Sequence, residues 1–437
     1  MTDKPRVLLV HPPIYDFSAY DFWMKPYGLL RVAGRLRGLC QLQSFDFLCS
    51  DAADAPPGGT WKRDAWKRDA WGRGPIPAEG TAKPEIFSFL PRYYRRFGIP
   101  RESFRAWLEG RPAFDFALVQ TGMTYWYLGL VETIEEIRRR SRETRIVLGG
   151  CYASLCPEHA RSLGADLVVR GGELDPLWRL LEREALPEQR PFWEAYAAPA
   201  YGVMKLADGC PFRCSYCASG RMHPGYAARP LDSVLEEWER LRSMGAAHIA
   251  FYDDALLFQP EKVLIPFLNA VLARGTGGLR FHTPNALHAR LLTAELASLM
   301  VRAGFASFYL GAESISPEWL ETSGAKVFPE ELSKATEILK NTGVPGSSIT
   351  AYLLLGHPAH SPEMIESSMR YIHRLGIRIM LAEYSPVPGT ADGERYGPAV
   401  AWQEPLWHNK TAFTAKILGW GEVCRLKHLC QQLNQPE

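Results

Sequence analysis

The chain has 437 residues, of which 46% are hydrophobic and 22% charged, and its net charge is +2. This composition is typical of a folded protein with two or three domains and argues against a disordered chain. Balanced charge gives no support to a nucleic-acid partner held by bulk electrostatics, and no apolar run approaches the ~20 residues that span a bilayer, so we expect neither a nucleic-acid partner nor a membrane span.

The first part of the chain alternates apolar strand patterns with helical ones. It begins with "RVLLV", a continuous apolar run that indicates a strand covered on both faces and not a signal peptide, so we expect a cytoplasmic protein. The alternation predicts an open, doubly wound parallel α/β sheet of the Rossmann or flavodoxin type over residues 1–185. The predicted strands are 6–10, 43–49, 114–123, 145–150 and 165–173, with helices over 28–38, 127–142 and 157–164.

An irregular insertion interrupts this series over about residues 50–84, which are rich in Pro, Gly and Ala. Inside it "WKRDA" occurs twice, at 61–65 and 66–70, and Trp71 follows. Two copies of five residues are too few to form a solenoid. We interpret them as a duplicated surface loop, and a partner-docking loop that uses Trp61, Trp66 and Trp71 is the alternative.

A linker over residues 186–199 leads to a second alternating series over 200–392. About six β/α units predict a partial (β/α)6 barrel, two units short of the full eight. Polar residues follow several of its strands, and in β/α barrels that rim carries the chemistry. A partly helical tail over 393–437 contains Cys424 and Cys430, to which we assign no role. The predicted barrel strands are 203–209, 248–254, 279–285, 305–314, 346–358 and 377–390.

Three of the nine cysteines fall within eight positions, in "CPFRCSYC". In a cytoplasmic protein we expect thiols or metal ligands rather than disulfides. Structural zinc needs four ligands, and His223 is poorly spaced to complete the set with Cys210, Cys214 and Cys217. Thiolates hold iron–sulfur clusters, and a triplet on one loop suits a cubane cluster with three irons anchored and the fourth open.

The spacing CxxxCxxC resembles the cluster motif of the radical S-adenosylmethionine (SAM) superfamily, with Tyr216 at its aromatic position. "FYDDALLF", "YLGAES", "LLLGHP" and "SPVPGT" resemble that family's second, fourth, fifth and sixth strand segments. The resemblance implies a 4Fe-4S cluster on the three cysteines, whose open iron chelates SAM, and a 5′-deoxyadenosyl radical formed by reductive cleavage. The SAM-binding residues expected on this basis are Tyr216, Asp253, Asp254, Asn285, Glu313 and Gly356.

The upstream sheet resembles the cobalamin-binding domain found in one subclass of this superfamily. The resemblance is carried by "VLLVHPP", "QTGMTYW", "VLGGCYASLCPEHA" and "ADLVVRGGE". Many cobalamin domains carry a DxHxxG motif whose histidine is the lower ligand, but the corresponding "DFLCSDAADAPPGG" has no histidine. We interpret the nearby Cys49, Cys151 and Cys156 as small buried hydrophobes. The cobalamin-binding residues implied by the resemblance are Thr121, Met123, Thr124, Gly149, Gly150 and Gly171.

The resemblance implies a cobalamin-dependent radical SAM enzyme, with methyl transfer to an unactivated carbon as the leading hypothesis and ring formation or rearrangement as variants. A cobalamin-independent enzyme with a vestigial first domain is an alternative. A non-catalytic iron–sulfur or cobalamin carrier is another, although a carrier needs no SAM-side strand motifs. The expected partners are a small-molecule or biosynthetic-intermediate substrate and an electron donor such as flavodoxin or ferredoxin, and no catalytic residue is assigned.

Overall fold

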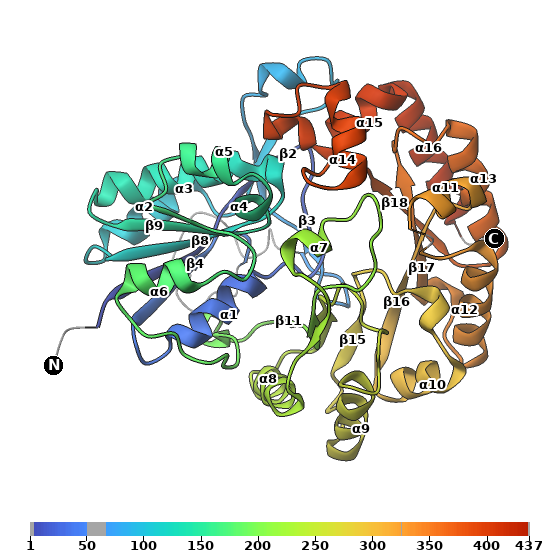
Figure 1. Cartoon of the computed structure of the whole chain (residues 1–437), viewed down its shortest axis with the longest axis horizontal. Coiled ribbons are helices and arrows are strands. Elements are labelled where there is room, and N and C mark those ends of the chain that lie inside the picture. Colours follow the sequence, from blue (N-terminus) through green and yellow to red (C-terminus); the bar gives the residue numbers. More distant parts are fainter. Residues whose placement is uncertain (1–3, 50–66, 325, 436–437) are drawn as a thin grey trace. The chain divides into compact units, whose positions relative to one another are not determined.

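The computed structural model describes residues 4–49, 67–324 and 326–435 (Figure 1). The chain forms two compact units. The first unit runs through Val203 and also includes Glu236–Ala247, and the second consists of Met204–Leu235 and the chain from His248 onward.

A five-stranded parallel sheet forms the centre of the first unit. Starting from the β4 edge, the strand order is β4-β1-β8-β9-β10. With the five strands numbered along the chain, this order is 2-1-3-4-5. This is the flavodoxin-like order, in which ligands bind beyond the carboxyl ends of the strands near the reversal between the first and third strands. The strands are β1 (Arg6–His11), β4 (Gln41–Asp46), β8 (Phe116–Thr121), β9 (Arg145–Gly150) and β10 (Leu167–Val169).

Helices cover both faces of this sheet, which explains why the run "VLLV" is apolar throughout. Val7 and Leu9 pack toward one face with α1 (Tyr27–Leu36) and α6 (Asp175–Leu181), and their neighbours Leu8 and Val10 pack toward the other. Side chains alternate across a strand, so a strand covered twice must be apolar at every position. The second layer consists of α2 (Arg101–Glu109), α3 (Tyr127–Arg140), α4 (Cys151–Leu155) and α5 (Pro157–Ser162).

Short elements accompany the predicted insertion. Residues 50–66, which include Trp61 and Trp66, lie outside the described residues. The Trp71 carbonyl accepts a hydrogen bond from Trp23 Nε1 at 2.8 Å, so the end of the repeat is attached to the first unit. Among the described residues this unit also contains two small antiparallel sheets and three 3-10 turns: β2 (Ile14–Asp16), β3 (Tyr20–Asp21), β5 (Gly74–Pro75), β6 (Ala78–Gly80), β7 (Arg95–Phe97), η2 (Glu85–Phe87), η3 (Thr124–Trp126) and η4 (Trp193–Ala195).

The second sheet has six strands in sequence order, β11-β14-β15-β16-β17-β18, and the pairs from β14 to β18 are parallel. Helices α9, α10, α12 and α13 lie on its outer side (Figure 1). The predicted fold class, a doubly wound sheet followed by a partial (β/α)6 barrel, is confirmed. The elements are β11 (Tyr201–Met204), β14 (His248–Phe251), β15 (Arg280–His282), β16 (Phe305–Glu313), β17 (Ile349–Leu355), β18 (Arg378–Glu383), α8 (Leu231–Ser243), α9 (Leu264–Arg274), α10 (Ala294–Arg302), α11 (Pro317–Thr322), α12 (Pro329–Asn341), α13 (Pro362–Arg374), η5 (Ala289–Leu291) and η6 (Gly346–Ser348).

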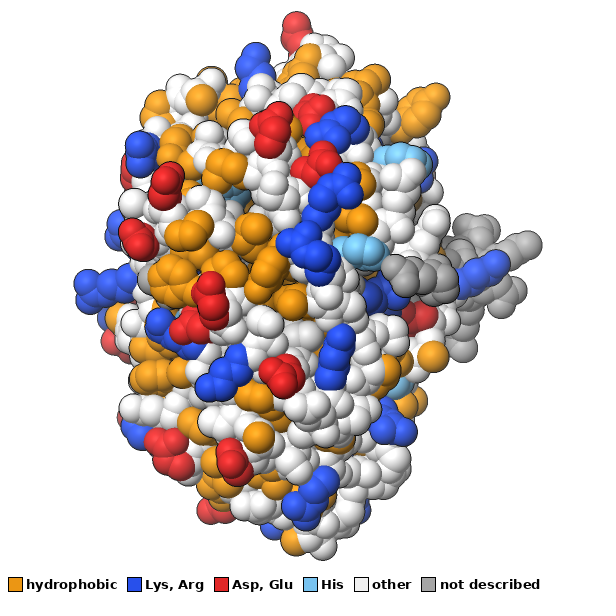
Figure 2. All heavy atoms as spheres, turned by 90° about the vertical axis from the view of Figure 1, so that its right-hand side faces the viewer, with side chains coloured by type: hydrophobic (Ala, Val, Ile, Leu, Met, Phe, Trp, Pro, Cys, Tyr) orange, Lys and Arg blue, Asp and Glu red, His pale blue; other side chains and the backbone are white. Residues whose placement is uncertain are grey.

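Acidic and basic side chains are interspersed on the face drawn in Figure 2. Among the residues that the structure describes, no helix is both long enough and apolar enough to cross a membrane.

The C-terminal tail packs along β18, the edge strand of the second sheet. The Asn434 side chain accepts a hydrogen bond from the Ile379 N–H and donates one to the Ile379 carbonyl, both at 2.8 Å. It therefore occupies the edge as a neighbouring strand would. Cys430 is buried beside Ile379, and Cys424 is exposed. The tail elements are α14 (Ala391–Tyr396), η7 (Gly397–Ala399), η8 (Pro405–His408), α15 (Lys410–Leu418) and α16 (Trp420–Leu433).

We expect Asn434→Ala to lower the free energy of unfolding by about 1–3 kcal/mol, because it removes the acceptor of the Ile379 N–H and leaves the Ile379 carbonyl with only the weak S–H donor of Cys430. Urea denaturation followed by circular dichroism measures this change. The exposed Gln431→Ala on the same helix is the matched control. Equal stability of the two variants would show that the edge contact contributes nothing.

Candidate functional site

The three clustered cysteines lie on a loop whose two ends are held together by the short antiparallel pair β12 (Ala207–Asp208) and β13 (Ala227–Ala228). Cys210 and Cys214 are partly buried and Cys217 is exposed. Burial, with smaller contributions from the nearby Cys217 and Cys214, raises the pKa of Cys210 to about 11, so the three thiols are electrostatic neighbours. Gly209 has a φ of +74°, and a Cβ there would lie 1.8 Å from the Gly225 carbonyl oxygen, so only glycine fits.

The described residues contain no group of three or more His, Cys, Asp or Glu side chains placed to hold a single metal ion. A single zinc ion would draw all of its thiolates to within about 2.3 Å of one point. A four-iron cluster makes no such demand, because each cysteine binds a different iron. Three cysteines on one loop are a donor set that can hold an iron–sulfur cluster.

The two carboxylates that follow β14 have different surroundings. Asp253 is buried and accepts hydrogen bonds from the N–H groups of Leu206 and Ala207 at 2.8–3.1 Å, so it holds the start of the cysteine loop. Burial raises its pKa to about 7, although Lys205 acts in the opposite direction. Asp254 is more accessible and pairs with Lys205 Nζ at 3.2 Å.

Asp254 also connects to the third cysteine through a serine. Ser219 Oγ donates to Asp254 Oδ1 at 3.0 Å and lies 3.2 Å from Cys217 Sγ. Both predicted carboxylates therefore lie beside the cysteine loop. Asp253 is bound to backbone N–H groups, whereas Asp254 is bound to side chains. The predicted Asn285 lies on the same rim, where its side-chain amide donates to the Tyr252 carbonyl at 2.9 Å.

Glu313 ends β16 in a strained backbone conformation with a φ of +61°, next to a break in the strand register after Gly311. Non-glycine residues at positive φ are uncommon and cluster at functional sites. Lys326 Nζ lies 3.0 Å from Glu313 Oε1. Burial raises the pKa of Cys214, and the positive charge of Lys326 opposes that rise. The Lys326 ammonium group is therefore close to a predicted cluster cysteine as well as to Glu313, whose carboxylate is predicted to bind SAM. Sequence reasoning missed Lys326, because the 13 positions that separate it from Glu313 carry no periodic pattern.

One buried side chain near the loop has polar atoms without hydrogen-bond partners among the described residues. It is His288, which is 4% exposed and whose two ring nitrogens are both unpaired. The centre of the His288 ring lies 4.2 Å from that of Phe212, the residue that stands between Cys210 and Cys214 in the sequence. Burial, with help from Lys326, lowers the pKa of His288 to about 3, so the imidazole is neutral. Buried polar atoms are rarely left unpaired, so the two His288 nitrogens have hydrogen-bonding capacity that the polar groups of a ligand could satisfy.

The aromatic position of the motif and the predicted fifth-strand glycine are also tightly packed. The Tyr216 ring stacks on Trp319 with a centroid distance of 5.8 Å. Gly356 has a φ of +82°, and a Cβ there would approach Thr414 to 2.5 Å. Gly356 therefore packs against the tail helix α15, and the structure assigns it a steric role that the sequence did not indicate.

The predicted cobalamin residues lie at the carboxyl edge of the first sheet, at the ends of β8, β9 and β10. Ser154, which sequence reasoning missed, joins two of them by donating to the Gly150 carbonyl and accepting from Gly171 N–H, both at 2.8 Å. A Cβ on Gly149 would contact only Val169, at 3.9 Å. The remaining predicted residues there are Thr121, which is fully buried and accepts a hydrogen bond from Ala153 N–H, Thr124, which is buried, and Met123, which is 52% exposed.

A buried polar network lies near the ends of β1 and β4. Asp46 accepts hydrogen bonds from Tyr196 at 2.6 Å and from His11 at 2.9 Å. Lys25 donates to Cys49 Sγ at 2.8 Å and lies over the Tyr196 ring at 4.0 Å. Cys49 is thus buried but holds a charged partner, unlike the apolar filler we expected.

The other two cysteines near this sheet differ from each other. Burial raises the pKa of Cys156 to about 12, as expected for a buried thiol. Cys151 begins α4 and is exposed, so the interpretation of this residue as a buried hydrophobe is wrong.

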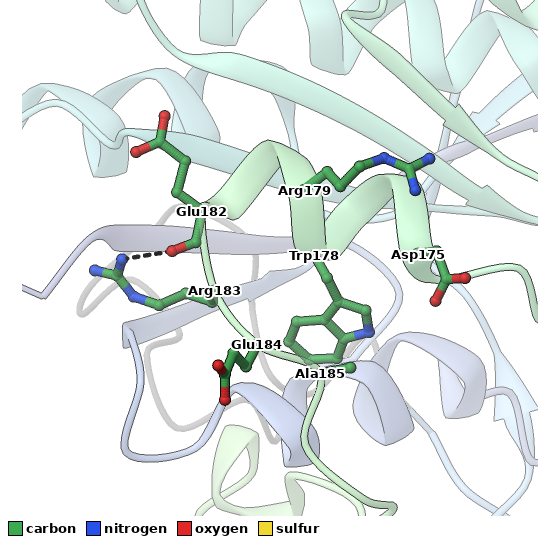
Figure 3. Close-up of a pocket in the computed structure, with 7 residues that line it drawn as sticks. All are labelled: Asp175, Trp178, Arg179, Glu182, Arg183, Glu184 and Ala185. Atoms are coloured by element: carbon green, nitrogen blue, oxygen red, sulfur yellow. Dashed lines mark hydrogen bonds between the residues drawn. The ribbon is translucent and has the colours of Figure 1, made fainter.

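A shallow surface hollow of about 720 Å³ lies at α6 and the segment after it (Figure 3). Opposite charges alternate along it, and it contains none of the predicted site residues. Its lining residues are Asp175, Trp178, Arg179, Glu182, Arg183, Glu184 and Ala185.

Comparison with known proteins gives a family match over part of the chain. Residues 204–378 match the Radical SAM superfamily. An uncharacterized methyltransferase of Pyrococcus horikoshii is 24% identical over 193 residues, which are 44% of this chain and 40% of that protein. A threonylcarbamoyladenosine tRNA methylthiotransferase of Thermotoga maritima is 23% identical over 275 residues, which are 59% and 63% of the two chains. The chain thus spans between 40% and 63% of these curated relatives.

Solved structures show a likeness over nearly the whole chain. The radical S-adenosylmethionine methyltransferase TsrM from Kitasatospora setae, solved with cobalamin and a [4Fe-4S] cluster, matches with a TM-score of 0.66 at 16% identity, over 98% of this chain and 91% of that one. The cobalamin-dependent S-adenosylmethionine radical enzyme OxsB, solved with aqua-cobalamin and S-adenosylmethionine, matches with a TM-score of 0.57 at 12% identity, over 98% and 61%. Residues 204–378 therefore match the Radical SAM superfamily, as the sequence resemblance predicted, and the chain, including the α/β unit before those residues, shares its fold with these two solved structures.

Proposed function

We propose that this chain is a radical SAM enzyme that binds a 4Fe-4S cluster through Cys210, Cys214 and Cys217, and that it is a cobalamin-dependent methyltransferase acting on carbon. The observation that carries the proposal is the three-cysteine loop of a radical SAM domain, beside buried polar atoms that have no partner. When bound, the cluster and SAM supply a 5′-deoxyadenosyl radical through one-electron cleavage of a sulfur–carbon bond.

The residues around the loop match the chemical groups of SAM. Lys326 offers a positive charge to a carboxylate, and Asp254 offers a negative charge to an ammonium group. Glu313 can accept hydrogen bonds from ribose hydroxyls. The neutral His288 can donate from one ring nitrogen and accept at the other, so it suits a ligand that carries both donors and acceptors.

The cobalamin part of the proposal rests on the first unit. Its flavodoxin-like strand order predicts a ligand at the carboxyl edge, where Gly149 at the end of β9 and Gly172 after β10 leave space. TsrM and OxsB, which share the fold, were both solved with cobalamin. In this proposal the substrate is a small molecule or biosynthetic intermediate, and the electron arrives from a flavodoxin- or ferredoxin-type donor. One curated relative acts on tRNA by name, and the absence of a nucleic-acid partner here stays a prediction.

We expect Cys214→Ala to abolish most cluster assembly, because the remaining two cysteines cannot anchor three irons. Iron and sulfide content after anaerobic reconstitution measures this, and 5′-deoxyadenosine formed from SAM and dithionite reports the chemistry. Cys424→Ala, which removes an exposed thiol on α16, is the control. Full cluster content in Cys214→Ala, or no 5′-deoxyadenosine from the wild type, contradicts the proposal.

We expect His288→Leu to weaken SAM binding about 10- to 100-fold, since a lost hydrogen bond to a charged group is worth roughly 1.5–3 kcal/mol. Anaerobic calorimetry on the cluster-loaded protein measures the Kd. His288→Gln retains a donor and an acceptor and should recover part of the loss. Unchanged affinity in His288→Leu would exclude this residue from the SAM site.

We expect Gly149→Leu to reduce cobalamin binding at least tenfold with little change in Tm, because the added side chain enters open space at the end of β9. The cobalamin absorbance that stays with the protein through gel filtration measures binding. Gly421→Leu, at an exposed helical glycine, is the control. If the wild type retains no cobalamin while it still cleaves SAM, the cobalamin-independent alternative replaces the leading hypothesis.

A further inference from the structure

After β18 the chain contacts the cysteine loop. The contact joins Ser215 and Asp392, which are 177 positions apart in the sequence. Ser215 lies between the second cysteine and Tyr216, and its hydroxyl donates to Asp392 Oδ2 at 2.6 Å. The Asp392 N–H donates to the Ser215 carbonyl at 3.0 Å. A single residue therefore holds Ser215 through both its side chain and its backbone.

Neighbouring contacts make this attachment rigid. Arg221, on α7 (Ser219–Met222), donates from Nε to the Gly389 carbonyl at 2.7 Å. Thr390 caps α14 by accepting the Gly393 N–H at 3.0 Å, which fixes the helical turn that carries Asp392. On the other side, the Ser215 N–H donates to the Ser323 carbonyl at 3.0 Å. The backbone next to Cys214 is therefore held from two separate segments of the second unit.

His357 orients the carboxylate of Asp392. It is fully buried at the end of β17, next to Gly356, and its Nε2 lies 3.1 Å from Asp392 Oδ2. Its Nδ1 accepts the Ala359 N–H, so Nε2 carries the proton and donates to the carboxylate. Burial acts to raise the pKa of Asp392, but the hydrogen bonds from His357 and Ser215 outweigh it and hold that pKa below its ordinary value.

We propose that Asp392, oriented by His357, is a positioning residue that fixes the direction of Cys214 on the cluster loop and ties that loop to the end of the fifth barrel strand. The inference rests on the proposed cluster site and deepens it. Groups that orient a metal ligand commonly change metal affinity by about 10- to 100-fold when they are removed, and they tune cluster potentials. Asp392 reaches the ligand only through Ser215, so it acts on geometry and charge and not by coordination.

The test compares the reconstituted full-length proteins Asp392→Ala, Ser215→Ala and the double variant, with Asp232→Asn at an exposed position of α8 as the control. We expect both single variants to lose iron to a chelator about tenfold faster than the wild type. The double variant should lose it no faster than the singles, because all three lack the same hydrogen bond. Asp392→Ala should also raise the midpoint potential of the cluster, because it removes a negative charge that Ser215→Ala leaves in place.

A spectroscopic readout separates positioning from general destabilisation. The electron paramagnetic resonance spectrum of the reduced cluster should change in Ser215→Ala while its circular dichroism and Tm remain those of the wild type. Iron-loss rates, potential and spectrum equal to the wild type in both single variants would overturn the positioning role and leave the cluster proposal standing. A wild type that takes up no cluster at all would overturn both.

Discussion

The hydrogen bonds that hold the cysteine loop are the constraint on which the second unit depends. Between β12 and α7 this loop has no strand ladder, so its backbone groups need partners from elsewhere. Two of those partners come from distant segments, Ser323 after α11 and Asp392 in the tail, and Asp253 after β14 holds the strand that leads into the loop. The tail is thus part of the loop's support as well as a cover for the sheet edge.

Charge balance is the second condition on this loop. Burial raises the pKa of Cys210 and of Cys214, so both are neutral thiols at neutral pH before any metal arrives. Metal ligation requires thiolates, so loading releases protons and leaves negative charge in a partly buried place. Lys326 and Lys205 are two of the cations beside the loop, and each is already paired with a carboxylate, so neither has to be recruited from solvent.

The sequence predicted both sheets and the cluster loop because their signals are local: continuous apolar runs, paired glycines at strand ends, and cysteines at fixed spacing. It could not distinguish Asp253 from Asp254, since only the hydrogen bonds separate the carboxylate that holds the backbone from the more accessible one. Lys326, Ser154 and Asp392 were missed for a different reason. Each acts on a residue brought close by the fold, and no periodicity or motif marks such a contact in advance.

The stretch that lacks the DxHxxG histidine begins in the buried core of the first unit. Asp46 and Cys49 belong to the stretch in which that histidine was expected, and both are buried. Asp46 is bonded to His11 and Tyr196, and Cys49 to Lys25, so the two side chains hold together the polar core of the first unit. A group already committed to a buried ion pair or hydrogen bond cannot leave it without a cost of several kcal/mol. Neither side chain is therefore available to serve as the lower ligand in the proposed cobalamin site.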